Sequence, residues 1–133
     1  MRARARFVLM LCLLPCFGCS KEKSTAELLA DLKAPEERER IIAVRTLPHR
    51  KGDAAQVVPA LIEALKDKDG DVRMSAALGL GSFGEQAKDA IPALEAAQKN
   101  GRDARVREAA GIALSRIDPA RFPDSSKLPP NGK

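Results

Sequence analysis

The stretch GLGSFG at residues 79–84 has the glycine spacing of a nucleotide-binding motif. Its Gly-x-Gly-x-x-Gly spacing is that of a loop that binds a dinucleotide pyrophosphate at the start of a helix. Such a loop follows a strand, whereas Val72, Ala76 and Leu80 continue one helical face into this motif. We therefore expect no nucleotide site. The first two glycines fit close helix contact or a helix ending, and Gly84 fits a left-handed helix cap.

The other candidate catalytic groups lack partners in the sequence. His49 is the only histidine and lies in the turn-like stretch PHRKGD, whereas a general base needs a nucleophile and an orienting group nearby. The carboxylates of EERER at residues 36–40 alternate with arginines, which is typical of a solvated helix start. A metal cluster would need more histidine, or cysteine beyond residue 19. We predict no catalytic residue, metal, cofactor or small-molecule substrate.

The first 19 residues contain all three cysteines and have the composition of an export signal. MRARAR is positively charged, and the apolar run FVLMLCLL that follows it is too short to cross a bilayer, which takes about 20 residues. This pattern is typical of a signal peptide. The position of the cysteines leaves the rest of the chain without a disulfide framework or a structural zinc site.

The segment ends in CFGC, which resembles a bacterial lipobox. Gly18 and Cys19 fit that pattern, whereas Cys16 stands where leucine is usual and Phe17 is larger than the usual small residue. The resemblance implies cleavage before Cys19 and acylation of its thiol. Several acyl chains would then hold the protein firmly at a membrane.

This resemblance divides the N-terminal part into a signal peptide at residues 1–18 and a lipidated cysteine with a polar spacer at residues 19–23. Because Ser20 rather than aspartate follows the cysteine, bacterial sorting rules imply the outer membrane, facing the periplasm. The predicted localisation is therefore the cell envelope. Secretion without a lipid, or an uncleaved N-terminal anchor, is the alternative.

The net charge of +5 includes Arg2, Arg4 and Arg6 of the predicted signal peptide, and without these three the charge is +2. Acidic residues alternate with basic ones along the rest of the chain, whereas nucleic-acid binding needs a coherent basic stripe. We expect no nucleic-acid partner.

A repeat of 33 residues organises the chain after the spacer. VVPALIEALK at residues 57–66 returns as AIPALEAAQK at residues 90–99, with Pro59 and Pro92 in the same place. In the first of these segments the apolar residues follow the i, i+3, i+4, i+7 spacing of one helical face. Repeats of 20–50 residues predict stacked supersecondary units. We expect three helix pairs at residues 24–52, 53–85 and 86–118.

The signals for helix ends repeat as well. Asp69 and Asp103 each precede a Val-Arg pair by the same spacing, and we predict both as N-caps, whose carboxylates accept free backbone N–H groups. The sequence from residue 118 onward is rich in proline and has no helical period, and residues 119–133 are predicted to be a disordered tail.

The three units resemble HEAT repeats of the short type also found in bilin-lyase-like proteins. The second unit, with PALIEALKD, VR and AALGLGSFG, is the nearest to the pattern. The resemblance implies an all-α fold, an α-solenoid of three stacked antiparallel helix pairs in a HEAT-like or armadillo-like superhelix.

In this family an aspartate at the end of the first helix and the arginine of Val-Arg form a ladder between units. Asp67 and Arg73 match that pattern. Arg40 and Arg107 keep the arginine, but alanine and asparagine stand where the acid would be, at residues 34 and 100. The resemblance therefore implies an incomplete inter-repeat ladder.

Solenoids present a concave surface lined by the second helix of each pair. The candidates on it are Arg45, Met74, Arg105, Glu108 and Arg116. These side chains either bind a partner or only make the helices soluble.

The third unit is more polar than the second, with Glu95 aligned to Ile62. This polarity favours a terminal cap and a complete small domain. The alternative is that a partner orders the chain.

Together these patterns predict a non-enzymatic, membrane-anchored scaffold that binds an unidentified protein partner in the bacterial cell envelope. The alternative is a bilin-lyase-like enzyme subunit or chaperone. Export counts against that alternative because those enzymes act on cytoplasmic pigment proteins.

Overall fold

A computed structural model of the chain describes residues 22–123. This part is helical, with no strand in it, as predicted. The α-helices are α1 (Thr25–Asp31), α2 (Glu37–Thr46), α3 (Ala54–Ala64), α4 (Gly70–Ser82), α5 (Ile91–Asn100) and α6 (Ala104–Ile117). Short 3-10 helices join the pairs: η1 (Leu47–His49), η2 (Lys51–Asp53) and η3 (Gly84–Ala90).

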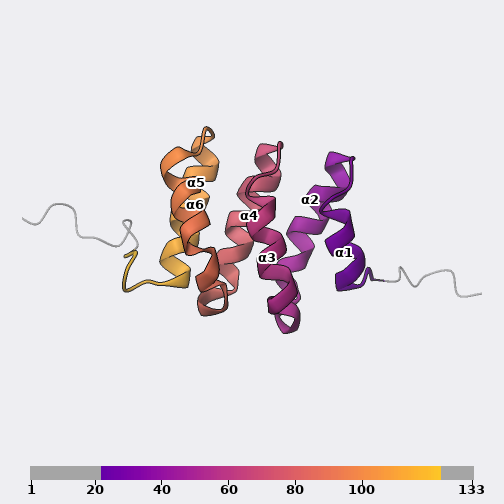
Figure 1. The fold of residues 1–133 in the computed structure, drawn as a ribbon, viewed down its shortest axis with the longest axis horizontal. Helices are drawn as coiled ribbons and strands as arrows, with labels where there is room; N and C mark the ends of the chain where they lie inside the picture. The colour runs from indigo at the N-terminus through magenta and orange to yellow at the C-terminus, as the bar shows by residue number, and fades with distance from the viewer. Residues whose placement is uncertain (1–21, 124–133) are drawn as a thin grey trace, which may run out of the picture.

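The helix pairs follow one another in chain order along the longest axis, from α1 and α2 at one end to α5 and α6 at the other (Figure 1). Each first helix contacts the second helix of its own pair, and α4 contacts both α2 and α6. The second helices thus form a continuous layer. The predicted α-solenoid of stacked helix pairs is confirmed. The predicted signal peptide and Cys19 lie outside the described residues.

Local sequence explains where the helices begin and end. The Ser24 side chain accepts from the Glu27 backbone N–H, and the Glu27 side chain accepts from the Ser24 backbone, which makes a capping box at α1. Pro92 lies in the first turn of α5, where a missing N–H leaves little unsatisfied. Its repeat equivalent Pro59 lies inside α3 instead, because that helix begins five residues earlier, at Ala54. Gly84 follows α4 with φ of 57°, the left-handed conformation expected of it.

The core repeats with the sequence. Each unit places one leucine of its first helix and one leucine of its second helical stretch in the core. These side chains are at most 1% exposed: Leu28, Leu61 and Leu94 in the first helices, and Leu47, Leu80 and Leu114 in the second stretches. Burying a leucine side chain contributes about 1.5–3 kcal/mol relative to leaving it exposed. Every unit therefore adds the same apolar residues to one continuous core.

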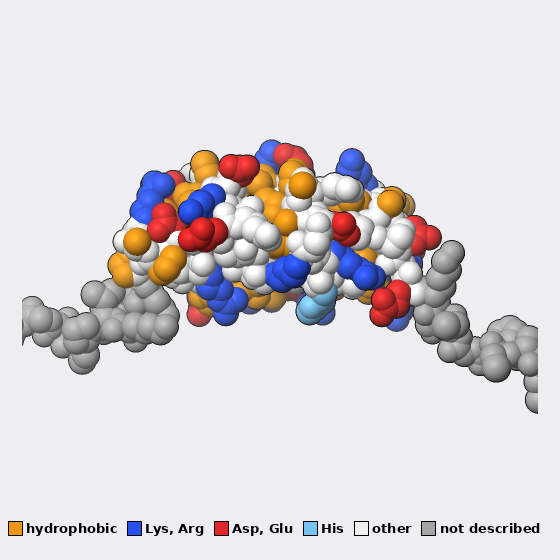
Figure 2. Space-filling model, turned by 90° about the horizontal axis from the view of Figure 1, so that it is seen from below, with side chains coloured by type: hydrophobic (Ala, Val, Ile, Leu, Met, Phe, Trp, Pro, Cys, Tyr) orange, Lys and Arg blue, Asp and Glu red, His pale blue; other side chains and the backbone are white. Residues whose placement is uncertain are grey.

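Small residues let the second helices approach closely. A Cβ placed on Gly79 would lie 2.7 Å from Cγ of Pro48, and one on Gly81 would lie 2.8 Å from Cα of Ala113. The first helices α1 and α3 are instead separated by a groove of about 600 Å³. The closer approach of the second helices bends the stack so that they lie on its inner side, and the outline is bowed (Figure 2).

The predicted disordered tail is wrong for its first five described residues, 119–123. Phe122 is half-buried and packs against the core, its N–H donates to the Asp118 carbonyl at 2.9 Å, and Arg121 pairs with Glu95 at 3.1 Å. The apolar ring of Phe122 and the half-buried acid on α5 draw this segment back onto the last unit. This stretch has no helical period, and periodicity detects only regular elements.

None of the helices described is both long and apolar enough to cross a membrane.

Candidate functional site

One rung of the predicted ladder connects the first two units. Nε of Arg40 on α2 donates to Oδ2 of Asp67 at 2.9 Å, just after α3, and Nη2 donates to Oδ1 at 3.3 Å. Nη1 donates to the carbonyls of Ala34 and Pro35 at 3.0 and 2.9 Å. The Arg40 side chain is only 5% exposed. The guanidinium therefore closes its own turn with one nitrogen and holds the next unit with the other two.

The contact joins neighbouring units, and the arginine in it is Arg40 rather than Arg73. The carboxylate of Asp67 binds Arg40 of the preceding unit and not Arg73, whose Nη1 donates to the backbone carbonyls of Asp67 and Lys68 at 2.7 and 2.9 Å. An acid at the end of a first helix lies beside the second helix that precedes it. By the repeat, the residue that would face Arg73 is Asn100, which carries no charge.

Arg107 has the same repeat position in the last unit. Its Nη1 donates to the Gly101 carbonyl at 2.8 Å, which again closes the turn between the two helices. Its side chain is exposed, and no carboxylate within residues 22–123 pairs with it. The three equivalent arginines thus have three different surroundings.

Both predicted cap residues stand at helix starts. Oδ1 of Asp69 accepts from the N–H groups of Asp71 and Val72 at 2.9 and 3.0 Å, before α4. Asp103 precedes α6, and its Oδ1 accepts from the Arg105 N–H at 2.9 Å. This backbone hydrogen bond, with one from the Arg105 side chain, lowers the pKa of the Asp103 carboxyl below its usual value.

Two of the predicted concave residues line one shallow hollow on the inner side. Arg45 of α2 is exposed, and Met74 of α4 is half-buried rather than fully exposed, since it packs against the core. Together with Leu78 and Ser82 they border a hollow of about 330 Å³ between the two helices. The inner surface therefore offers an apolar floor beside an exposed cationic side chain.

The other three predicted concave residues lie apart from that hollow, on α6. Arg105 is bound to Asp71 of α4 at 2.9 Å and to Asp103 at 3.2 Å, and these acids raise the pKa of its guanidinium. Glu108 is exposed and borders a groove at the C-terminal end of the stack. Arg116 is exposed, with its Cδ 3.5 Å from the Cβ that Gly81 would have. The ion pair between Arg105 and Asp71 therefore connects the third unit to the second.

Lys51 makes a contact between units that the sequence pattern did not predict. Its Nζ donates to the carbonyl and hydroxyl oxygens of Ser82, and lies 4.2 Å from the centre of the Phe83 ring. Burial lowers the pKa of its amine. Only the contact across units distinguishes Lys51 from other surface lysines, and repeat spacing carries no such signal.

No group of three or more His, Cys, Asp or Glu within the described residues could hold a metal ion.

The sequence pattern of the family described as HEAT repeats matches residues 25–115, most of the chain and all six α-helices in part or whole. The chain belongs to the HEAT-repeat family. None of the curated proteins compared with it matches. HEAT repeats are commonly scaffolds for protein interaction and are generally not enzymes. For this HEAT-repeat protein, the inner hollow and the ends of the stack are accordingly candidate binding surfaces.

Proposed function

We propose that this HEAT-repeat protein is a scaffold that is anchored through a lipid on Cys19 and binds another protein in the bacterial cell envelope. The observation that carries the binding role is the inner hollow, where the half-buried Met74 and Leu78 lie beside the exposed Arg45. Such a surface suits a partner segment with apolar and acidic side chains, because apolar burial gives affinity and charge gives orientation.

The anchor rests on the resemblance of CFGC to a lipobox and on the short apolar run before it. The compact domain starts at α1, a few residues after Cys19. A lipid there would hold the first unit near the membrane and leave the inner face of the stack accessible to a partner.

Metabolic labelling with a palmitate analogue tests the anchor. We expect label in the wild-type chain and in Cys16→Ala, because Cys16 precedes the predicted cleavage site, and none in Cys19→Ala. Equal labelling of wild type and Cys19→Ala would refute lipidation. The Cys16→Ala control shows whether replacing a nearby cysteine is enough to remove the label, or whether the label requires the thiol of Cys19.

Pull-down from envelope extracts tests the binding role. A protein retained by the wild type should be lost with Arg45→Glu combined with Met74→Asp. It should be retained with Lys66→Glu, which changes an exposed lysine after α3, outside the residues that line the hollow. A partner lost equally with both variants would place its binding elsewhere.

A further inference from the structure

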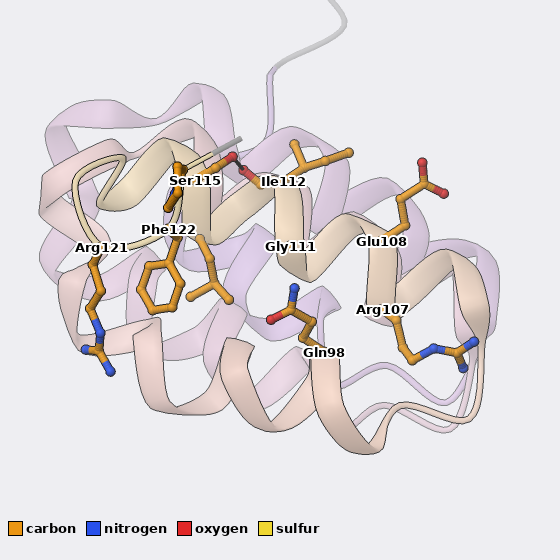
Figure 3. Close-up of a pocket in the computed structure, with 10 residues that line it drawn as sticks. Gln98, Arg107, Glu108, Gly111, Ile112, Ser115, Arg121 and Phe122 are labelled. Atoms are coloured by element: carbon orange, nitrogen blue, oxygen red, sulfur yellow. Dashed lines mark hydrogen bonds between the residues drawn. The ribbon is translucent and has the colours of Figure 1, made fainter. Parts of the chain in front are cut away.

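A second hollow lies at the C-terminal end of the stack. This C-terminal groove has a volume of about 720 Å³ and is bordered by α5, α6 and residues 121–123. Figure 3 shows Gln98 and Gly111 near its middle, Phe122 toward one end and Arg107 toward the other. Ile112, a large apolar residue that is 38% exposed, borders it too.

In the first two units the matching surface is covered by the next unit. Pro48 of the first unit contacts the position of Gly79, and Gly81 of the second contacts Ala113. By the repeat, Ser115 of the third unit corresponds to Pro48 and Gly81, and it lines the open groove. The groove is therefore the continuation of the interface that stacks the units.

The charge at the groove specifies what would cover it. Where a unit follows, Arg40 is 5% exposed and holds Asp67 with Nε and Nη2. Arg107 makes the same turn-closing contact with Nη1, and its other nitrogens have no carboxylate among residues 22–123. A guanidinium fork recognises a carboxylate with two parallel hydrogen bonds. The covering element needs an acid at this point.

A second copy of this chain does not supply that acid. In a head-to-tail stack its first unit would cover the groove, and Ala34 would take the place of Asp67. Glu27 and Asp31 of that first unit stand where α3 has Ala60 and Ala64. A second copy would therefore bring charged side chains to a surface that the middle unit covers with small apolar ones.

We infer that the C-terminal groove binds a helix of a different protein, which carries an aspartate or glutamate at its N-terminal end opposite Arg107 and apolar side chains opposite Ile112 and Leu114. The acid belongs at the N-terminal end because Asp67, the residue it mimics, lies in the turn between α3 and α4, three residues before α4 begins. Of these two helices, α4 is the one that packs along α2. Negative charge is also favoured there by the helix dipole. This surface is separate from the inner hollow and goes beyond the proposed function.

Site-specific photo-crosslinking in cells that produce the full chain tests the inference. A photoreactive residue is placed at Ser115 in the groove and, in a separate chain, at Gln98, in case one position disturbs folding. We expect an adduct with another polypeptide, whose crosslinked peptide is helical and begins with an acid. Arg107→Gln should lower its yield about tenfold or more, and Arg102→Gln, an exposed arginine in the same turn that does not line the groove, should not.

An adduct between two copies of this chain, an adduct insensitive to Arg107→Gln, or no adduct from either position would overturn the inference. A third chain with the photoreactive residue at Met74 reports on the inner hollow. Crosslinking from Met74 without crosslinking from Ser115 or Gln98 would refute the groove while leaving the proposed function intact.

Discussion

At the scale of single residues, the three equivalent arginines show that a repeat position does not fix a side chain's energetic role. Arg40 and Asp67 form an ion pair that is almost removed from water, with side-chain exposures of 5% and 12%. Removing one member of a buried pair leaves the other charge uncompensated. Arg107 has the same sequence context and an exposed side chain, where an ion pair or its absence has little effect on stability.

Arg40→Ala should therefore lower the free energy of unfolding by about 3 kcal/mol, and Arg107→Ala by less than about 1 kcal/mol. Urea denaturation of the two variants beside the wild type measures the difference. A cycle with Asp67→Ala isolates the coupling between the two side chains. Equal losses for both arginine variants would show that the rung does not stabilise the junction.

At the scale of elements, helix starts and helix contacts are set by short-range chemistry. The carboxylates of Glu27 and Asp103 accept hydrogen bonds, chiefly from backbone N–H groups, and these hydrogen bonds lower the pKa of both groups. A carboxyl with a lowered folded-state pKa adds stability above its unfolded value, and this contribution is lost as the pH falls through the folded value.

Stability should thus fall as the pH drops below about 4, where these carboxyls take up protons. Asp103→Asn keeps a side chain that can cap α6 but removes the titration, so its stability should depend less on pH between 5 and 2.5 (about the range in which a carboxyl with a lowered pKa titrates). Denaturation midpoints across this range, with the exposed Asp89→Asn as control, measure the change. An unaltered pH dependence in Asp103→Asn would contradict the cap's electrostatic role.

The contact between α4 and α6 gives a second expectation at this scale. Gly81→Ala places a methyl group 2.8 Å from the backbone of Ala113, whereas Gly111→Ala meets only the Gln98 side chain at 3.0 Å. Both gain up to about 1 kcal/mol of helix propensity, but overpacking costs about 1–3 kcal/mol at Gly81. Gly81→Ala should melt below the wild type and Gly111→Ala at or above it in circular dichroism.

At the scale of the whole molecule, α4 holds the stack together because it contacts both α2 and α6. Each outer unit depends on the middle one to bury its apolar face, and few units are present. In such a stack the stability of each unit is coupled to its neighbour. The described part of the chain is therefore expected to unfold as one body.

Leu80→Ala, at a side chain with no exposure, should lower stability by about 2–5 kcal/mol and shift a single transition in scanning calorimetry. Ile42→Ala, at a side chain 49% exposed on α2, should shift it little. Two separate transitions in Leu80→Ala, or a broad transition in the wild type, would mean that the units do not fold cooperatively.

The helices, their pairing and the core can be predicted from the amino-acid sequence, because these depend on local periodicity and on leucines that return every 33 residues. It also identified Gly84 as a helix cap, since only a left-handed backbone needs glycine there. Cys19 stays a prediction from the sequence.

Which charges meet depends on the tertiary fold. Asp67 pairs with Arg40, 27 positions away, and Lys51 with Ser82, 31 positions away, because residues of neighbouring units come together when units stack. Phe122 folds back onto the core. The same packing separated the predicted concave residues into an inner hollow near Arg45 and a groove near Glu108. Periodicity places a residue on a face of its helix, but the distance between faces depends on how closely the helices pack.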